Sequence, residues 1–191
     1  MATRVLRTPI IIDAFKAVDR KDFVPPHTLE FAYYDEALHI DYDQTISQPT
    51  TVAIMLELLQ PQKGQQILDV GSGSGWTTAL LSFIVGSGGS VIGLEIVPQL
   101  VEFGQKNLAK YSFPQSKIVQ AGKALGLPGE LFDRVLVSAA AKEVPDELIE
   151  QLKSGGKMVI PVEYSLMLVE KGSEGRVKQK EIPGFSFVVL K

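Results

Sequence analysis

A glycine-rich turn in the first half of the chain constrains the fold more than any other feature. The segment 66–71 is typical of a buried strand, glycines follow at alternate positions (Gly71, Gly73 and Gly75), and a helix-forming run begins at once. Glycine is needed where the backbone turns with positive φ or lets a ligand approach closer than a Cβ would allow. The next helix offers unpaired N–H groups and the positive end of a dipole. We therefore expect a strand, a turn and a helix that bind a polar, nucleoside-like ligand.

The composition is that of a globular chain of ordinary domain size. The 191 residues include 45% hydrophobic and 21% charged residues, which is enough apolar material for a full core. We expect one domain over 1–191. Within it we expect a helical, substrate-side segment at 1–60, a cofactor-binding core at 61–162 and a hairpin at 163–191.

The composition also disfavours several classes of protein. A net charge of −3 leaves no general basic surface, so we expect no nucleic-acid partner. The absence of cysteine excludes disulfides, thiol catalysis and thiolate metal sites. The two histidines, His27 and His39, leave little material for a zinc or triad site, so we expect no metal. With no membrane-spanning apolar run and no signal-peptide pattern, we expect a cytoplasmic monomer with no membrane association.

Strand and helix patterns alternate through the middle of the chain. The expected helices are 1–24, 49–59, 76–85, 98–110 and 145–152, and the expected strands are 66–71, 90–96, 117–121, 133–138 and 157–162. After residue 162 the helices stop, and 165–171 and 185–190 have strand patterns. Such alternation predicts an α/β, Rossmann-like fold: a mostly parallel sheet with helices on both faces and a C-terminal antiparallel hairpin.

Two acids near the turn narrow the choice of nucleotide. The dinucleotide fingerprint is G-x-G-x-x-G, whereas the glycines here alternate. Asp69 precedes the turn, where it would attract a cationic ligand end and repel a pyrophosphate. Glu95 ends the next strand, about twenty residues past the turn, where a carboxylate can accept two ribose hydroxyls. These acids suit S-adenosyl-L-methionine (S-adenosylmethionine), which has a positive methionine end and no phosphate. The alternative is that Asp69 is an ordinary turn acid and Glu95 a solvated strand end.

Longer motifs follow one another along the chain. They lie at 44–49 (QTISQP), 69–75, 94–98, 138–141 and 155–161, with further matching stretches at 18–25 and 32–38. On these motifs the chain resembles the protein-L-isoaspartate O-methyltransferases along nearly its whole length. The 45–49 motif is the discriminating one, because general methyltransferases lack it. The resemblance implies an S-adenosylmethionine-dependent methyltransferase fold.

The resemblance implies a role in the repair of damaged proteins. The family methylates the free α-carboxylate of L-isoaspartyl residues in proteins and peptides with S-adenosylmethionine, and the ester then collapses to a succinimide. By motif, Ser47 matches the active-site serine that meets both substrate and cofactor. The other implied cofactor residues are Thr45, Ile46, Asp69, Gly71, Ser72, Gly73, Gly75, Glu95 and Gly122. The implied substrate loop, which contacts the peptide through its backbone, is Ser138, Ala139, Ala140 and Ala141.

The implied chemistry agrees with the shortage of histidine and cysteine. A carboxylate is already ionised at pH 7 and a sulfonium is an activated donor, so neither a base nor a metal is required. The protein mainly has to hold oxygen, methyl carbon and sulfur in line and to keep water away. Ser47 is therefore expected to orient the carboxylate and not to act as a nucleophile.

The chain departs from the family pattern at four places. Lys123 stands where the family has an aspartate that accepts from the adenine amino group, and 41–43 (Asp-Tyr-Asp) stands where it has G-x-G. Thr50 replaces an aromatic residue or histidine, and Lys142 replaces a proline. Two alternatives therefore stay open: a methyltransferase for another carboxylic acceptor, and a cofactor-binding protein without activity.

Overall fold

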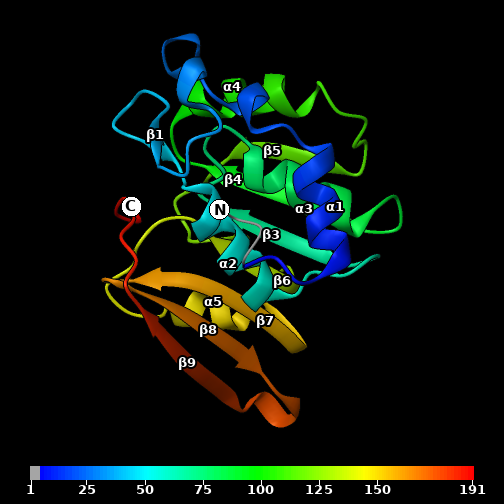
Figure 1. Ribbon diagram of the computed structural model, residues 1–191. Helices are drawn as coiled ribbons and strands as arrows, with labels where there is room; N and C mark the ends of the chain where they lie inside the picture. The colour runs from blue at the N-terminus through cyan, green and yellow to red at the C-terminus, as the bar shows by residue number, and fades with distance from the viewer. Residues whose placement is uncertain (1–4) are drawn as a thin grey trace.

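A seven-stranded sheet forms the centre of this computed structural model, which describes residues 5–191. The strand order is β5-β4-β3-β6-β7-β8-β9. The strands are β3 (Gln66–Val70), β4 (Ser90–Glu95), β5 (Ser116–Gln120), β6 (Phe132–Val137), β7 (Leu152–Val162), β8 (Ser165–Lys171) and β9 (Val177–Pro183). Strands β3 to β7 pair in parallel, and β8 and β9 continue the sheet antiparallel (Figure 1). The predicted fold class is thereby confirmed.

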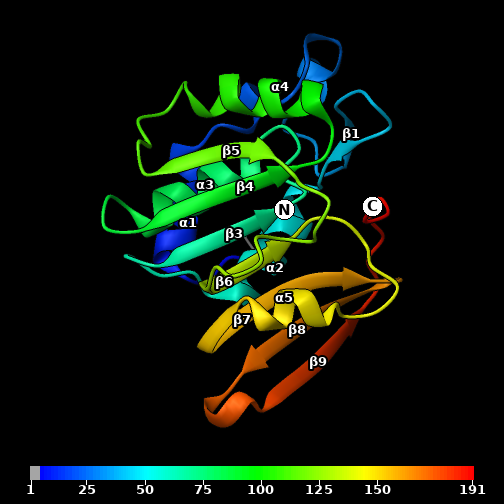
Figure 2. The ribbon, with the colours of Figure 1, turned by 180° about the vertical axis from the view of Figure 1, so that it is seen from behind.

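Helices cover both faces of the sheet. They are α1 (Pro9–Ala17), α2 (Pro49–Leu59), α3 (Trp76–Val85), α4 (Pro98–Leu108) and α5 (Asp146–Glu150). Helix α2 packs against β6 and β7, α3 against β3 and β4, and α4 against β4 and β5, while α1 lies on α3. Figure 2 shows α5 on the opposite face, beside β7. Within residues 5–191, no helix combines the length and apolar character needed to cross a membrane.

The alternation of side chains along β3 explains why it is buried on both faces. Ile67 belongs to the core on the side of α1 to α4, whereas Leu68 and Val70 belong to the core on the side of α5. Successive side chains of a strand point to opposite faces, so Asp69 points toward α3, like Ile67. This direction decides what Asp69 can reach.

The N-terminal helix is shorter than expected. Its predicted range, 1–24, begins outside the described residues, and α1 ends at Ala17 because Val18 is extended (φ −108°). A separate 3-10 turn, η2 (Arg20–Phe23), follows, and its start is capped by Asp19, which accepts from the Lys21 amide. The expectation of one helix to residue 24 is therefore wrong.

The second hairpin strand lies earlier than expected. Strand β9 is formed by Val177–Pro183. Its alternating lysines give this segment a charged pattern that does not resemble a buried strand, although such side chains are typical of an exposed sheet edge. The apolar segment 185–190, predicted as that strand, instead leaves the hairpin and returns toward the parallel strands, where Val189 bridges to Ala140. Strand β7 also begins earlier, at Leu152, which shortens the expected helix 145–152 to α5.

Candidate active site

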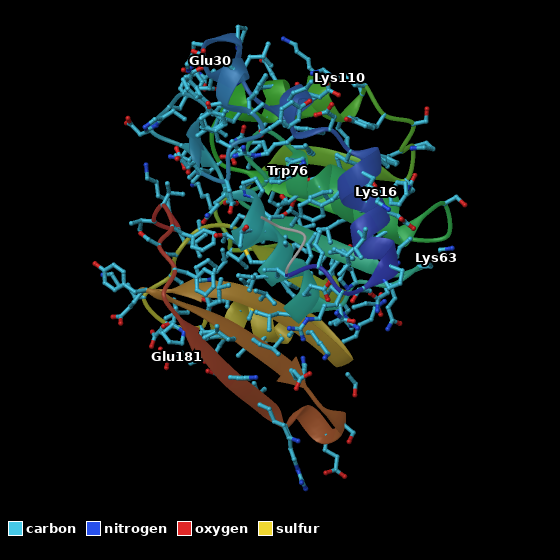
Figure 3. The ribbon with its side chains drawn as sticks, viewed as in Figure 1. Lys16, Glu30, Lys63, Trp76, Lys110 and Glu181 are labelled. Carbon is cyan, nitrogen blue, oxygen red and sulfur yellow. The ribbon has the colours of Figure 1, made fainter. Side chains whose placement is uncertain are left out.

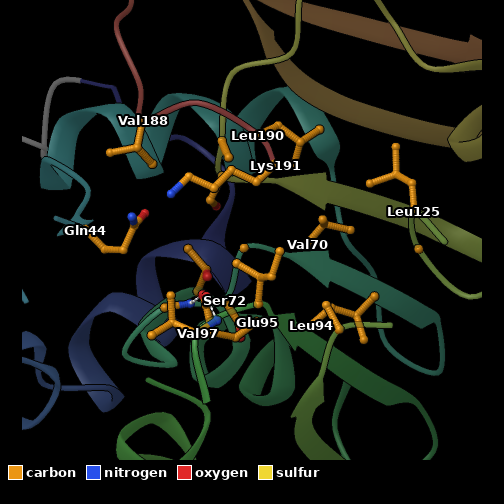
Figure 4. Close-up of a pocket in the computed structure, with 18 of the residues that line it drawn as sticks. Gln44, Val70, Ser72, Leu94, Glu95, Val97, Leu125, Val188, Leu190 and Lys191 are labelled. Carbon is orange, nitrogen blue, oxygen red and sulfur yellow. Dashed lines mark hydrogen bonds between the residues drawn. The ribbon is translucent and has the colours of Figure 1, made fainter. Parts of the chain in front are cut away.

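A pocket opens at the carboxyl ends of β3 and β4, beside the point where the strand order reverses. In doubly wound sheets the connections diverge at this point and leave a crevice for a ligand. The cavity volume is about 570 Å³, within the usual range for small-molecule sites. Figure 4 shows Ser72 and Glu95 on one side of the pocket and Leu190 and Lys191 on the other.

The glycine turn has the backbone conformation that its sequence predicts. Gly71, Gly73 and Gly75 have φ values of 76°, 52° and 91°. Gly71 and Gly73 line the pocket, whereas Gly75 lies outside its lining. A Cβ on Gly75 would lie 2.8 Å from Ile118 Cδ1 and 3.1 Å from the Gly104 carbonyl oxygen. Gly75 therefore lets α3 pack closely on α4 and β5, and the prediction that it contacts the cofactor does not fit its position.

Glu95 ends β4 inside the pocket, with only 5% of its surface exposed. Its Oε2 accepts from the Gly73 amide (2.8 Å) and its Oε1 accepts from the Val97 amide (2.9 Å). Two fixed backbone donors hold the carboxylate in one orientation. Because a carboxylate oxygen accepts more than one hydrogen bond, both oxygens keep capacity for ligand hydroxyls.

Asp69 lies beneath the turn instead of in the pocket wall. The residue is fully buried, and its Oδ2 accepts from the hydroxyls of Thr77 (2.7 Å) and Thr78 (2.6 Å) at the start of α3. Burial, together with the nearby charge of Glu95, raises the pKa of Asp69 to about 6, although the two hydroxyl hydrogen bonds lower it. Asp69 thus anchors the first turn of α3, and the expected contact with a methionine end does not follow from this position.

The acceptor segment, which we define as residues 44–47, also lines the pocket. Thr45 and Ile46 form the short strand β2 (Thr45–Ile46), which pairs antiparallel with β1 (Leu38–His39). Ser47 follows, and α2 begins two residues later with its proline in the first turn, as expected. The structure therefore brings Ser47 into one cavity with Gly71, Gly73 and Glu95.

The turn between β1 and β2 has an uncommon backbone. Asp41, Tyr42 and Asp43 have φ values of 69°, 54° and 57°, the left-handed region that glycine adopts without strain. This geometry gives a physical reason for the G-x-G of the family pattern at this turn. Here three side chains occupy it, and strain of this kind gathers near functional sites.

The expected substrate loop is divided between the pocket and the chain's own C-terminal segment. Ser138 and Ala139 line the pocket, whereas Ala140 and Ala141 do not. The Ala140 amide donates to Val188 (2.7 Å) and its carbonyl accepts from Leu190 (2.9 Å), while the Ala141 amide donates to Pro161. These backbone groups are already paired, so Ala140 and Ala141 do not fit the expected backbone contact with a peptide.

Residues 188–191 line the pocket, and they were absent from the predicted site. Their apolar pattern resembles a strand, which is how it was interpreted, and no local motif marks them as pocket residues. Their place depends on the pairing with Ala140, about fifty residues earlier.

The far end of the pocket is formed by the loop after β5. Gly122 and Lys123 are exposed and line the pocket there, with lysine where the family has an acid. Gln151 shapes this loop: its Oε1 accepts from the Leu127 amide (2.7 Å) and its Nε2 donates to the Leu125 carbonyl (2.9 Å). Gln151 is buried and lies well away in sequence, so spacing alone could not identify it.

Comparison with known proteins agrees with this geometry. The sequence model of the family described as Protein-L-isoaspartate(D-aspartate) O-methyltransferase (PCMT) matches residues 1–191. The chain belongs to this family. A Methanopyrus kandleri protein-L-isoaspartate O-methyltransferase is 41% identical, over 97% of this chain and 84% of the relative. A Thermococcus onnurineus protein of the same name is 42% identical, over 97% of this chain and 87% of the relative.

A solved structure extends the likeness to three dimensions. It is the PCMT of Plasmodium falciparum in complex with S-adenosyl-L-homocysteine, with a TM-score of 0.86 and 27% identity. The match covers 99% of this chain and 93% of the Plasmodium chain. The PCMT likeness therefore includes the hairpin β8–β9 and the acceptor segment as well as the cofactor-binding core.

Proposed function

We propose that this protein transfers a methyl group from S-adenosylmethionine to the free α-carboxylate of L-isoaspartyl residues in damaged proteins and peptides. The observation that carries the proposal is that the acceptor segment and the glycine turn line one pocket. In this arrangement Ser47 can meet the carboxylate while Gly71, Ser72, Gly73 and Glu95 hold the methyl donor. The match to the PCMT family over the whole chain supports the same activity.

The polar groups of the pocket fit S-adenosylmethionine. Glu95 is held by two backbone amides and can accept both ribose hydroxyls. Ser72 belongs to the pocket lining, and its buried Oγ has no hydrogen-bond partner among residues 5–191. Bound S-adenosylmethionine supplies a sulfonium-activated methyl group, which makes a catalytic base unnecessary.

Ser47 would act by orienting the acceptor. A carboxylate with a pKa near 4 is ionised at neutral pH, and the Ser47 hydroxyl can donate to one of its oxygens without losing its proton. Apolar residues around it, among them Ile46 and Leu190, limit access of water to the reacting atoms. Most of the catalytic effect then comes from alignment of the two reactants.

A paired-peptide assay tests the proposal. The protein is incubated with labelled S-adenosylmethionine and either an isoaspartyl peptide or its normal aspartyl twin. We expect label in the isoaspartyl peptide alone. Equal labelling of both peptides, or none, would contradict the proposal, and activity on another carboxylic acid would replace it with a methyltransferase of different acceptor. Calorimetry with S-adenosylhomocysteine shows separately whether the protein binds its cofactor. This control is useful because Lys123 stands where the family has an acid on the adenine side.

We further propose that the enzyme acts as a monomer in the cytoplasm. The groups assigned to the two reactants, among them Ser47, Gly73 and Glu95, line one pocket within a single chain. Light scattering behind a sizing column should give the mass of one chain at assay concentration. A dimer mass would overturn the monomer, and fractionation of cells tests the compartment.

A further inference from the structure

Arg20 is a buried arginine whose guanidinium group donates hydrogen bonds to main-chain carbonyl groups. It lies at the start of η2 and is only 5% exposed. Its guanidinium donates to the carbonyl oxygens of Ala32 (2.7 Å), Tyr34 (3.3 Å), Glu36 (2.8 Å) and Ser47 (3.2 Å). One side chain thus joins three points of the irregular stretch at 32–36 to the acceptor segment at Ser47.

An irregular stretch needs such a partner. Its carbonyl groups lack the regular pairing of a helix or a long strand, and buried carbonyls without partners are costly. Arginine has a planar fork of five donors, which can serve several carbonyls at once, whereas lysine has three donors on a point charge. Burial, partly offset by the charge of the neighbouring Asp35, lowers the pKa of Arg20 to about 10. The guanidinium therefore stays charged at neutral pH.

Asp35 holds the residues that follow Ser47. Its Oδ1 accepts from the Thr50 amide (2.9 Å), its Oδ2 accepts from the Thr50 hydroxyl (2.7 Å), and its carbonyl accepts from Gln48 Nε2 (2.9 Å). Thr50, one of the departures from the family pattern, thereby acquires a role as the partner of Asp35. Arg20 thus holds the Ser47 carbonyl, and Asp35 holds the residues that follow it.

The same guanidinium reaches the helix of the glycine turn. Its Cζ lies 5.4 Å from the ring centroid of Trp76, within the range of a cation–π contact. Trp76 is the first residue of α3 and lines the pocket, and its ring makes an edge-to-face contact with Phe15. Figure 3 shows Trp76 in the middle of the molecule, close to α1. Arg20 thus contacts both the acceptor segment and the first residue of α3, the helix that follows the glycine turn.

We propose that Arg20 is a positioning residue for methyl transfer, which fixes Ser47 relative to the cofactor pocket. This inference rests on the proposed function. Arg20 lies outside the pocket lining, so it acts through the Ser47 backbone and not by contact with substrate. Because transfer requires near-attack alignment, loss of this anchor lowers turnover more than it lowers cofactor affinity.

Arg134 provides a matched control. It is also buried (7% exposed) and also donates to main-chain carbonyls, those of Leu59, Gln60 and Asp133. Leu59 and Gln60 lie at the end of α2 remote from Ser47, and Asp133 belongs to β6. Arg134 is not a pocket residue. Arg134→Lys therefore reproduces the loss of a buried guanidinium without touching the acceptor segment.

The experiment compares Arg20→Lys with Arg134→Lys in the full-length protein. For Arg20→Lys we expect kcat on the isoaspartyl peptide to fall roughly tenfold to hundredfold, with the Kd of S-adenosylhomocysteine within about threefold. For Arg134→Lys we expect a lower Tm but kcat within about twofold of the wild type. Guanidinium added to Arg20→Ala should restore part of the turnover, whereas sodium chloride at equal ionic strength should not.

A second measurement is independent of turnover. Amide hydrogen exchange should rise at residues 44–50 in Arg20→Lys and stay unchanged at residues 71–75. If wild-type protein labels no isoaspartyl peptide, the proposed function fails. Hydrogen exchange then still tests whether Arg20 holds residues 44–50 in place. Unchanged exchange at 44–50, or equal losses of Tm and kcat in the two lysine variants, would reduce Arg20 to a residue of general stability and overturn the inference.

Discussion

The donor wall of the pocket, residues 71–75 with Glu95, and the acceptor segment reach the same cavity by different routes. The donor wall continues two adjacent parallel strands, and main-chain bonds from the first two turn residues to β4 hold it in place. The acceptor segment has only a two-residue strand. It depends on Arg20, which bonds Ser47 across 27 residues, and on Asp35, which bonds Thr50 just after the segment. We therefore expect substitutions in the donor wall to affect stability and cofactor binding, and substitutions in the acceptor segment to affect turnover.

The largest effect expected in the donor wall is on stability, at Gly75. Gly75→Ala introduces both an unfavourable φ and a Cβ 2.8 Å from Ile118 Cδ1, and we expect it to lower the free energy of unfolding by about 3 kcal/mol. Gly129 has nearly the same φ, 89°, but open space around it, so Gly129→Ala should cost only about 1 kcal/mol. Urea unfolding of both variants measures the difference, and equal losses would show that close packing at Gly75 is unimportant.

In the acceptor segment the expected loss is in turnover. Ser47→Ala should lower kcat on the isoaspartyl peptide about a hundredfold, because the hydroxyl that orients the carboxylate is removed. The Tm and the Kd of S-adenosylhomocysteine should stay near the wild-type values. Ser116→Ala removes a buried hydroxyl remote from the pocket and serves as the control. A Ser47 variant that binds cofactor weakly but turns over normally would contradict the assignment of turnover to the acceptor segment and cofactor binding to the donor wall.

The pH dependence of stability tests the burial of Asp69 behind the donor wall. Its pKa is about 6 in the folded protein against an ordinary 3.8, so between these values the folded chain holds a proton that the unfolded chain has lost. This contribution to stability is present below the lower value and is lost as the pH rises through the higher one. Relative to Asp69→Asn, the wild type should therefore lose on the order of 2 kcal/mol of unfolding free energy across this window.

Urea titrations of the wild type and Asp69→Asn at several pH values measure this loss. Parallel curves would mean that Asp69 has an ordinary pKa and a more polar surrounding than its position indicates. A repeat with saturating S-adenosylhomocysteine asks whether a bound cationic group lowers the pKa of Asp69, which would restore the cofactor role that we expected from the motif.

A smaller effect is expected at Glu95, where a substitution should change the affinity for the cofactor. Glu95→Gln keeps the shape of the side chain but replaces one of its two acceptor oxygens with a donor, next to two backbone amides. We expect the Kd of S-adenosylhomocysteine to rise about tenfold, or roughly 1.4 kcal/mol, with kcat at saturating cofactor nearly unchanged. Glu102→Gln on the exposed side of α4 is the calorimetric control. Unchanged affinity would remove Glu95 from the cofactor site.

The donor wall could be predicted because its signals are contiguous. A buried strand, alternate glycines and a helix follow one another, and Glu95 lies at the corresponding end of the next strand. Motif membership did not say which residues face the ligand. Asp69 points toward α3 because it shares the face of Ile67, and Gly75 is constrained by Ile118, on a different strand. Side-chain direction and long-range packing decide these two cases.

The acceptor side was predictable only in part, because its supports are distant in sequence. Ser47 was found by its motif, but its backbone bond to Arg20 spans 27 residues, and no local spacing signals such a contact. The C-terminal segment shows the same limit. Residues 185–190 have a strand pattern, yet the edge of β8 is taken by the charged β9, and the apolar segment pairs with Ala140.

The smallest expected effect lies in the strained turn beside the acceptor segment. Asp43 is exposed and has a φ of 57°, so Asp43→Gly should relieve strain and raise the unfolding free energy by about 0.5 kcal/mol, after the added entropy of the unfolded chain is counted. Asp43→Ala removes the same charge without relief of φ and should not stabilise. If Asp43→Gly is more stable but turns over as fast as the wild type, the strain is incidental. If turnover falls with the gain in stability, the left-handed turn helps to aim Ser47, and the acceptor segment then depends on backbone geometry as well as on its two polar anchors.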